Sequence, residues 1–332
     1  MVKTAVIVRI IVWLVVAAVL IAVLAAGLAG YKVFKWDFNL FNINLGRYSY
    51  EDSGKYTAGN AELNASGLDS IDIDWVSGGV NITPYEGDTL KISESSNGHI
   101  SAEEQLRWYY NGESLVIKFC APRTKLSLGT LEKELTVFVP ETIARDLENV
   151  NVNSVSAYVK LSGLECGSIR AETVSGESSF AGLNAAGLQS STVSGSIKLK
   201  DAVIQNIMLE SVSGGIDSEN LSAGSVKAIS NSGRIRIGGS VGSFKAETTS
   251  GRIILDSTIC PKSIDAETVS GSIELLLPSD SSFTAELDSV SGSIEYDFMA
   301  KGGKNYIIVG DGSSEFRIES ISGGLSIRQR DK

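Results

Sequence analysis

Four acidic residues recur at one point of a repeated sequence pattern, each four residues before the glycine of a Ser-Gly dipeptide. They are Glu247, Glu267, Asp288 and Glu319, in four successive copies. If copies lie side by side, like charges about 4.8 Å apart repel unless a cation or a lysine intervenes. Such a column could chelate calcium, and paired carboxylates could also hydrolyse glycosides. Solvated side chains that point apart are the simplest alternative, so we assign no metal ligand, cofactor-binding or catalytic residue.

Hydroxyl residues accompany the same dipeptide. Ser or Thr occurs one and three residues before each glycine, for example Ser194 and Thr192 before Gly195. In stacked copies these residues would form a ladder of hydroxyls, which could bind a glycan or ordered water. Hydroxyls at a tight turn more often satisfy backbone groups of that turn, and we favour this interpretation.

Other reactive side chains are few. His99 is the only histidine, which excludes a histidine-based triad and a multi-histidine metal site. Cys120, Cys166 and Cys260 are odd in number and lack CxxC spacing, so buried free thiols are favoured over a disulfide. Walker loops, GxGxxG fingerprints and GGxGxD repeats do not occur. We therefore expect a non-enzymatic protein without a cofactor, with a polysaccharide-active β-helix enzyme as a remaining alternative.

The Ser-Gly dipeptide itself returns about every nineteen residues. Ala157 occupies the glycine position in the first regular copy, and Gly78 is an outlying early copy. The glycines of the series are Gly176, Gly195, Gly214, Gly233, Gly251, Gly271, Gly292 and Gly323. A fixed period of this kind is typical of a repeat architecture, in which each copy is one structural unit.

Within a copy, apolar residues stand two and four residues after the glycine, as Ile197 and Leu199 do after Gly195. Weaker apolar positions follow near offsets 7, 9 and 12. Alternation with period two predicts strands with one buried face, and we expect three short strand segments per copy. One copy cannot bury its apolar face alone, so the copies must stack. The sequence thus predicts an all-β fold, a β-solenoid of about nineteen-residue coils.

The glycine at a fixed phase implies one corner that needs either a positive φ or a close backbone approach. Residues 61–150 contain alternating stretches without the regular period, which predicts irregular opening β coils; a separate β-domain is the alternative. Residues 151–332 form the regular repeats. Asp297–Phe316 lengthens the last copies and contains a strand-like segment, Tyr306–Val309, which predicts a hairpin that covers or extends the C-terminal end.

An uninterrupted apolar run, Ile10–Ala29, precedes the repeats. At 1.5 Å per residue its twenty residues span about 30 Å, the thickness of a bilayer core. We predict one N-terminal transmembrane helix, with residues 1–30 forming the inner tail and the span and residues 31–60 a juxtamembrane segment. Because a short N-terminal tail is poorly translocated, the repeats are expected outside the cell membrane. A cleaved signal peptide is the alternative.

Charge and composition fit an exterior location. The chain carries 29 Lys and Arg against 39 Asp and Glu, a formal net charge of −10. Residues 1–36 contain four of the basic residues and no acid, so the remainder has 25 minus 39, or −14. A surface of that charge repels nucleic acid, and we expect no nucleic-acid partner.

Several motifs together resemble a known family. They are Val-Ser-Gly-Ser-Ile at 193–197 and again at 290–294, Glu-Leu-Thr-Val-Phe-Val-Pro at 134–140, Gly-Asp-Gly at 310–312, and Ile-Glu-Ser-Ile-Ser-Gly-Gly at 318–324. This combination resembles the bacterial "putative adhesin" family, a domain of unknown function made of β-strand repeats on cell-envelope proteins. The resemblance covers roughly residues 60–330 and brings no catalytic residues with it. It implies a cell-surface adhesion or interaction module that binds a surface glycan or an envelope protein.

The resemblance also leaves a second role open, because some relatives are encoded beside envelope-stress regulators. In that role the chain would be an accessory to a signalling system and would act through its membrane segment. The two hypotheses differ in where function resides. Exchange of the ectodomain should abolish the first function, and replacement of residues 1–36 by an unrelated anchor should abolish the second.

Overall fold

The computed structural model describes residues 43–44, 47–124, 131–303 and 305–330. Residues Ile43–Lys332 form one compact unit. The described helices are two short ones, η1 (Ser53–Lys55) and α2 (Glu141–Ala144), and strands make up the rest of the regular structure. The expected all-β class is confirmed. In the described part of the chain, no helix is long and apolar enough to span a membrane; the predicted span Ile10–Ala29 lies outside the described residues.

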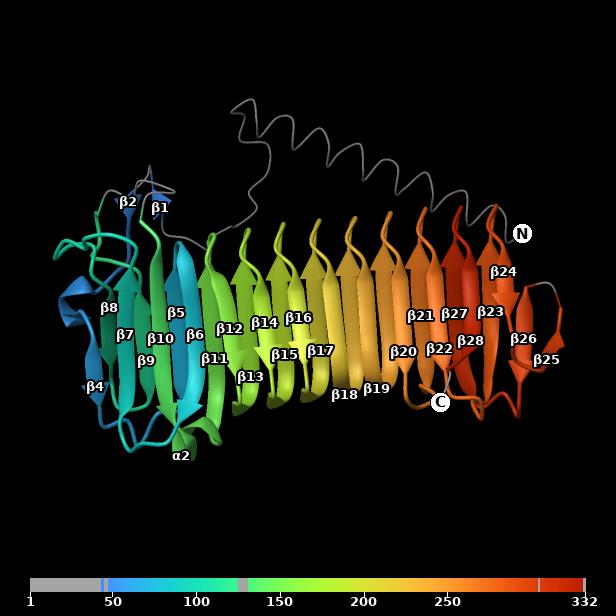
Figure 1. Ribbon diagram of the computed structural model, residues 1–332, viewed down its shortest axis with the longest axis horizontal. Coiled ribbons are helices and arrows are strands. Elements are labelled where there is room, and N and C mark those ends of the chain that lie inside the picture. Colours follow the sequence, from blue (N-terminus) through green and yellow to red (C-terminus); the bar gives the residue numbers. More distant parts are fainter. Residues whose placement is uncertain (1–42, 45–46, 125–130, 304, 331–332) are drawn as a thin grey trace, which may run out of the picture. The chain divides into compact units, whose positions relative to one another are not determined.

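The strands stack as parallel coils in two opposed layers (Figure 1). We call the layer whose strands run into the Ser-Gly turns the leading sheet. Its strands are, in spatial order, β5 (Ser70–Trp75), β11 (Leu147–Ser154), β13 (Glu165–Thr173), β15 (Asn184–Thr192), β17 (Val203–Ser211), the second parts of β18 (Ile216–Ser230) and β19 (Ile235–Thr248), β21 (Ser263–Thr268), β27 (Ser314–Ser320) and β23 (Phe283–Ser289).

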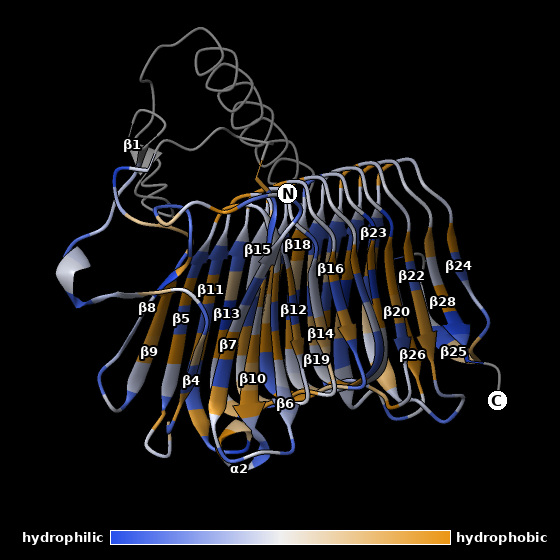
Figure 2. Ribbon diagram, turned by 60° about the vertical axis from the view of Figure 1, so that its left-hand side comes forward, coloured by the Kyte–Doolittle hydropathy of each residue, from blue (hydrophilic) through white to orange (hydrophobic). Residues whose placement is uncertain are grey.

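The trailing sheet contains the strands that leave the Ser-Gly turns. In the same order they are β6 (Gly78–Tyr85), β12 (Tyr158–Ser162), β14 (Ser178–Ala181), β16 (Ile197–Lys200), the first parts of β18 and β19, β20 (Ile253–Ser257), β22 (Ile273–Leu277), β28 (Leu325–Gln329) and β24 (Ile294–Tyr296). Hydrophobic and hydrophilic residues alternate along many of these strands (Figure 2), and buried residues alternate with less buried ones, as in β22.

Each coil therefore contains two strands, and the expectation of three was wrong. The apolar positions at offsets 9 and 12 lie in the same leading strand, as Ala185 and Leu188 do in β15, and both are buried. Positions three apart cannot face the same side of a regular strand, whose side chains alternate. The alternation breaks at Ala186–Gly187, where two successive residues are both unburied. Strand β15 nevertheless stays paired with β13 on either side of this break.

The core lies between the two sheets. The residues at offsets 2 and 4 face inward, and Ile235, Ile237, Ile273 and Leu275 are at most 1 % exposed. Burial of such aliphatic side chains contributes about 25 cal/mol per Å² of apolar area removed from water. The predicted strand phase is confirmed for the regular coils.

The Ser-Gly glycines are required by a close backbone approach and not by a positive φ. A Cβ added to any of Gly176 through Gly323 in the series would lie only 1.5 to 2.0 Å from a carbonyl oxygen of the adjacent coil. Ala157 tolerates its methyl group because it lies against Gly78, which turns with φ +97° and so follows a different path. Positive φ occurs instead at the opposite corner, at Gly163, Gly182, Asp201, Asn220 and Gly239.

The chain closes the first coil by folding back over it. After β6, it forms β7 (Leu90–Ser96), β8 (Arg107–Tyr110), β9 (Ser114–Lys118) and β10 (Lys133–Pro140). Strand β9 pairs with the outer edge of β5, and β10 with the outer edge of β6. Antiparallel strands β4 (Ala61–Leu63) and β3 (Thr57–Ala58) then pair with β7 and β8, while β1 (Ile43–Asn44) and β2 (Arg47–Tyr48) form a separate pair.

At the C-terminal end, the last coil in the sequence is inserted between two earlier coils. Strand β27 pairs with β21 on one side and with β23 on the other, so the last coil in sequence lies inside the one before it. Strands β25 (Ala300–Gly302) and β26 (Tyr306–Val309) form an antiparallel hairpin on the outer edge of β23. The predicted hairpin is confirmed, and it extends the leading sheet alone.

Candidate functional site

The four acidic residues form one column on the outer surface of the leading sheet, but in a different order from that expected. Glu247 pairs in register with Glu267, Glu267 with Glu319, and Glu319 with Asp288. The sequence order placed Asp288 beside Glu267. That expectation was wrong because β27 inserts between β21 and β23 and carries Glu319 with it.

Basic side chains of the chain itself neutralise much of this column. Lys245 Nζ lies 3.1 Å from Glu247 Oε1 and 2.7 Å from Asp265 Oδ2. Arg317 Nη2 lies 2.6 Å from Glu319 Oε1. The neighbouring column, two residues earlier on the same strands, alternates in charge as Lys245, Asp265, Arg317 and Glu286. Its cations relieve part of the repulsion between the stacked carboxylates.

Glu267 and Asp288 are the two members of the column without such a partner among the described residues. Burial raises the pKa of Glu267, and the carboxylates of Asp265 and Glu319 raise it further. The described residues contain no group of three or more His, Cys, Asp or Glu side chains arranged to hold a metal ion. The ionised form of Glu267 is therefore destabilised in the folded protein, and the described residues around it do not form a set of metal ligands.

The hydroxyl ladder is turn chemistry, as we favoured. The hydroxyl three residues before the glycine is buried in all of these turns except that of Ser289, where it is partly buried. It accepts a hydrogen bond of 2.8 to 3.0 Å from the N–H of the glycine, as Thr192 does from Gly195, or of Ala157 in the first regular copy. The serine one residue before the glycine is exposed and donates to a carbonyl of the adjacent coil, as Ser194 does to Val174 at 3.4 Å. Ser211 differs, because its buried hydroxyl has no partner within the described chain.

Between these two hydroxyls lies a position that the sequence analysis overlooked. It carries an apolar residue in most coils, and we call this set the valine column. In spatial order its apolar members are Val155, Val174, Val193, Val212, Val269, Ile321 and Val290. Val212, Val269 and Val290 are 46 %, 39 % and 63 % exposed.

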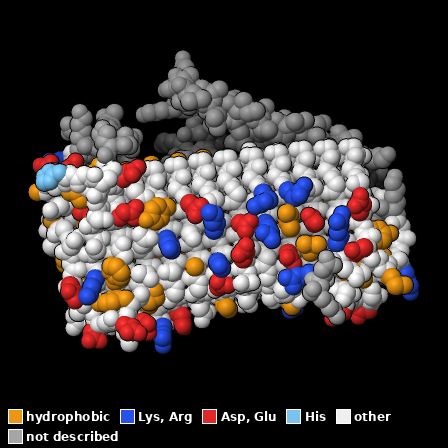
Figure 3. All heavy atoms as spheres, in the orientation of Figure 1, with side chains coloured by type: hydrophobic (Ala, Val, Ile, Leu, Met, Phe, Trp, Pro, Cys, Tyr) orange, Lys and Arg blue, Asp and Glu red, His pale blue; other side chains and the backbone are white. Residues whose placement is uncertain are grey.

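The recurring tripeptide Val-Ser-Gly could have indicated this column in the sequence. Its valine does not belong to the two-residue alternation of the core. Asn231 and Thr249 interrupt the column in the middle of the stack. Charges elsewhere on the surface are mixed, with acidic and basic side chains interspersed along the face that Figure 3 shows. The valine column is therefore a repeated apolar feature of this edge, in addition to exposed apolar residues elsewhere such as Tyr158, Val203 and Ile259.

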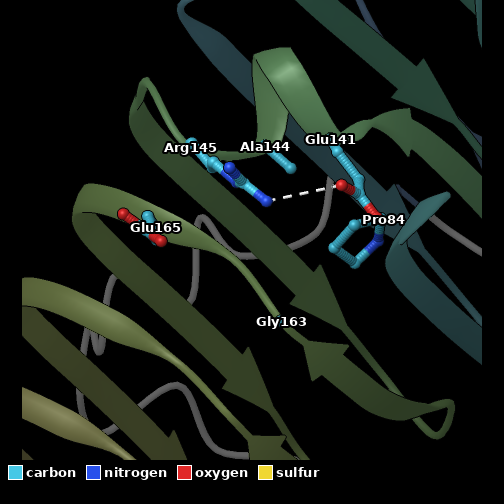
Figure 4. A pocket seen from close by; sticks show the side chains of 6 residues that line it. All are labelled: Pro84, Glu141, Ala144, Arg145, Gly163 and Glu165. Atoms are coloured by element: carbon cyan, nitrogen blue, oxygen red, sulfur yellow. Dashed lines mark hydrogen bonds and ion pairs between the residues drawn. The ribbon is translucent and has the colours of Figure 1, made fainter. Parts of the chain in front are cut away.

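One shallow pocket of about 190 Å³ lies beside α2 (Figure 4). Its lining includes Pro84, Gly163 and Glu165, together with Glu141 and Arg145, which form an exposed ion pair of 3.4 Å. Exposed ion pairs contribute little stability, and their side chains remain solvated. The pocket contains no nucleophile paired with a base, so it has no feature that favours catalysis.

The remaining reactive residues are dispersed. His99 is exposed, and the three cysteines are free, as we favoured. Cys120 is buried, whereas Cys166 and Cys260 are only partly buried. Burial raises the pKa of the thiols of Cys120 and Cys166 to about 11, which keeps both protonated and unreactive at neutral pH.

The N-terminal end contains a buried ion pair that the sequence did not reveal. Lys133 is fully buried, and its Nζ lies 2.5 Å from Glu94 Oε1. The ammonium also lies 4.0 Å from the ring centroid of Phe119 and 5.0 Å from that of Trp75. Burial lowers the pKa of Lys133. Lys133, Trp75 and Phe119 are each at most 1 % exposed, so this cluster is part of the buried core at the N-terminal end.

Comparison with known proteins places the chain in a family. The family described as Toastrack DUF4097 matches residues 68–328, which confirms the resemblance found in the sequence. None of the curated proteins matches the chain in sequence.

Among solved structures, a "putative cell adhesion protein" from Clostridium sporogenes shares 13 % identity, covering 83 % of this chain and 100 % of that one at a TM-score of 0.26. A "putative adhesin" from Bacteroides fragilis shares 14 %, covering 82 % and 97 %, at 0.39. A "putative lipid binding protein" from Parabacteroides distasonis shares 17 %, covering 83 % and 97 %, at 0.49. At these scores the likenesses decide neither ligand nor activity.

Proposed function

Because this chain belongs to the Toastrack DUF4097 family, we propose that it is a non-enzymatic interaction module on the outside of a cell, held by one N-terminal membrane span. The apolar run Ile10–Ala29 supports the span, since twenty residues suffice to cross a bilayer core of about 30 Å. The net charge of the remainder, 25 minus 39 or −14, supports a role away from nucleic acid.

The valine column is the observation that carries this proposal. Val212, Val269 and Val290 are exposed in it, and its other four apolar members are partly buried, so the column is a repeated and partly exposed apolar line at one edge. Apolar side chains scattered singly need no explanation, but apolar surface gathered along one edge is typical of an interaction surface. The row repeats at the coil spacing of about 4.8 Å. Hydrogen-bonded turns hold the residues of the column in fixed positions, as the bond from the Gly195 N–H to the Thr192 hydroxyl does beside Val193.

The chemistry of the row favours an envelope protein over a glycan as partner. Valine side chains gain by desolvation against other apolar side chains. The neighbouring serines donate their hydroxyl protons to backbone carbonyls, as Ser213 and Ser270 do. Those protons are therefore committed within the fold and are poorly placed to bond sugar hydroxyls.

A capture experiment tests the proposal. The full chain carrying Val212→Asp and Val269→Asp should lose capture of envelope proteins and should keep its melting temperature. Val203→Asp is the matched control, because Val203 is 56 % exposed at the start of β17, beyond the opposite corner. Unchanged capture by the double variant would refute the proposal. Selective loss of glycan capture would instead assign the edge to carbohydrate.

Topology and the location of function need separate tests. Protease added outside intact cells should remove the repeats, and a soluble product that begins near residue 30 would show cleavage in place of anchoring. Replacement of residues 1–36 by an unrelated anchor should preserve the function. If that replacement abolishes it, the chain acts through its membrane segment, as an envelope-stress accessory would.

A further inference from the structure

Two neighbouring coils depart from the repeat at the Ser-Gly edge. In the other regular coils a valine or isoleucine stands two residues before the glycine position, and a residue that is not basic follows that position. One coil has Asn231 and Arg234 at these two places, and the next coil has Thr249 and Arg252. All four side chains are exposed. A site on a repeated scaffold consists of residues that break the repeat, so this pair of coils is a candidate for recognition.

The basic residues of these coils lie side by side. Arg234 and Arg252 each come one residue before a paired position, Ile235 opposite Ile253, so they occupy adjacent places about 4.8 Å apart. Arg236 stands two residues after Arg234 and faces the same outer surface, because side chains alternate along a strand. Figure 3 shows basic side chains close together near the upper edge of the face in view. We call Arg234, Arg236 and Arg252 the arginine cluster.

The chain itself neutralises only part of this cluster. Arg234 Nη2 lies 3.3 Å from Asp217 Oδ2, and this is the one ion pair of the cluster among the described residues. Arg252 Nε donates to the hydroxyl of Ser272 at 3.0 Å, which orients its guanidinium without neutralising it. Like charges at adjacent positions of a sheet destabilise it. Three guanidinium groups and one carboxylate leave 3 minus 1, or +2, on this part of the trailing sheet.

The other carboxylates of the neighbouring coils do not form ion pairs with the cluster. Asp256 lies two residues beyond Ile254 and accepts a hydrogen bond of 2.5 Å from Arg330 Nε. Glu274 lies one coil further along, in register with Ile254 and diagonal to Arg252. The guanidinium of Arg234 remains accessible, since its side chain is 60 % exposed. The arginine cluster is therefore open to an anion from solution.

The chemistry of the cluster favours a phosphate monoester. Guanidinium groups have planar forks of N–H donors, which bind the oxygens of phosphate and carboxylate in pairs. A phosphate monoester carries a charge of about −1.5 to −2 at pH 7, which matches the +2 of the cluster better than the single charge of a carboxylate. The amide of Asn231 and the hydroxyl of Thr249 at the same corner add neutral donors. A long polyanion would be repelled by the charge of the chain beyond residue 36, 25 minus 39 or −14.

We propose that the arginine cluster binds one phosphate monoester group through the guanidinium N–H groups of Arg234, Arg236 and Arg252. The site lies where Asn231 and Thr249 interrupt the valine column, and it does not depend on the partner of that column. Soluble phosphosugars and lipid headgroups both present this group. Its chemistry is the same in either source, and separate probes distinguish the two.

Thermal melting of the full chain in detergent micelles tests the site with inorganic phosphate. Millimolar phosphate should raise the melting temperature above that in chloride at matched ionic strength, because a ligand that binds only the folded state stabilises it. A double variant, Arg234→Gln with Arg252→Gln, should bind phosphate about tenfold more weakly. In chloride this variant should melt no lower than the unsubstituted chain, since it lacks two adjacent like charges. Loss of the phosphate response would then not reflect misfolding.

A matched control removes the same charge from the same sheet. Lys200→Gln with Arg328→Gln takes two exposed cations from the outer surface of the trailing sheet and should keep the phosphate response. An equal loss of response in both double variants would show general electrostatic attraction and would overturn the inference. Val212→Asp with Val269→Asp should keep the response, so failure of the proposed function leaves this result unaffected.

Two further probes identify the source of the phosphate group. In titration calorimetry, glucose 6-phosphate should bind where glucose does not, and its binding should weaken in Arg234→Gln with Arg252→Gln. For a lipid source, the full chain in phosphatidylcholine nanodiscs should sediment with vesicles only when these contain phosphatidic acid, and only with both arginines present. Either result supports the phosphate site and names its source. The inference fails if inorganic phosphate, glucose 6-phosphate and phosphatidic acid vesicles all show no dependence on these arginines.

Discussion

Gly323 lies directly against Gly271, although Gly292 separates them in the sequence. A Cβ on Gly323 would stand 1.5 Å from the carbonyl oxygen of Gly271, and one on Gly292 would stand 1.8 Å from that of Gly323. The chain therefore skips one coil position after β22, forms the outermost coil and hairpin, and returns to fill the gap. The final strands β27 and β28 are thus paired on both edges, which protects the end of the chain from fraying.

The close approach of the Ser-Gly glycines predicts a large cost for any side chain. Gly195→Ala would place a methyl group 1.9 Å from the carbonyl oxygen of Gly176. Because backbone must move to relieve that clash, we expect the free energy of unfolding to fall by about 3 kcal/mol in chemical denaturation. Gly187→Ala is the control, since its Cβ would meet nothing within 4 Å; it should change stability by about 0.5 kcal/mol or less. Equal effects would contradict the stacking.

The buried pair of Lys133 and Glu94 predicts strong non-additivity. Lys133→Met leaves a buried carboxylate without its cation, which should cost about 3 to 5 kcal/mol of unfolding free energy. Addition of Glu94→Gln should recover much of that loss, because the second change removes the unpaired charge. A double-mutant cycle by urea denaturation measures the coupling. Additive effects would show that the two side chains contribute independently.

Glu267 predicts a specific dependence of stability on pH. The pKa of Glu267 is raised in the folded protein above its unfolded value of about 4.3. At pH values between the unfolded and the folded pKa, the native state therefore binds more protons than the unfolded state. Stability should consequently fall as pH rises through that window. Glu267→Gln should raise the melting temperature at pH 7 and have little effect below pH 4. Glu286→Gln, which alters an exposed carboxylate on β23, should leave the profile unchanged. A wild-type profile in Glu267→Gln would refute this account.

The ion pairs within the acidic column predict no selectivity for calcium. Lys245 and Arg317 already neutralise neighbouring carboxylates, so millimolar calcium and magnesium should shift the melting temperature equally at matched ionic strength. A stabilisation by calcium that magnesium does not reproduce, and that disappears in Glu267→Gln, would mean chelation. That outcome would indicate that the binding surface is the acidic column on the leading sheet and not the valine column.

Much of the architecture followed from the sequence because a solenoid coil is determined by local, repeated information. The glycine period placed the Ser-Gly turns, and the two-residue alternation correctly assigned Ile235 and Ile273 to the core. The hydroxyls of Thr192 and Ser194 were interpreted correctly for the same reason, since their partners lie in the same turn or the next one. The surface was harder to read: the valine column was overlooked because its valines stand outside the core alternation.

What only the tertiary structure decided is the order of coils at the two ends. Sequence order alone placed Asp288 beside Glu267, whereas pairing of β27 between β21 and β23 places Glu319 there. Which strand occupies an edge depends on which backbone ladder and which apolar face it completes, and those partners are distant in sequence. The same reason hid the burial of Lys133 beside Glu94 and the exposure of Tyr296 at an inward position. Repetition specifies how one coil stacks on the next, and only long-range packing specifies where the stack ends.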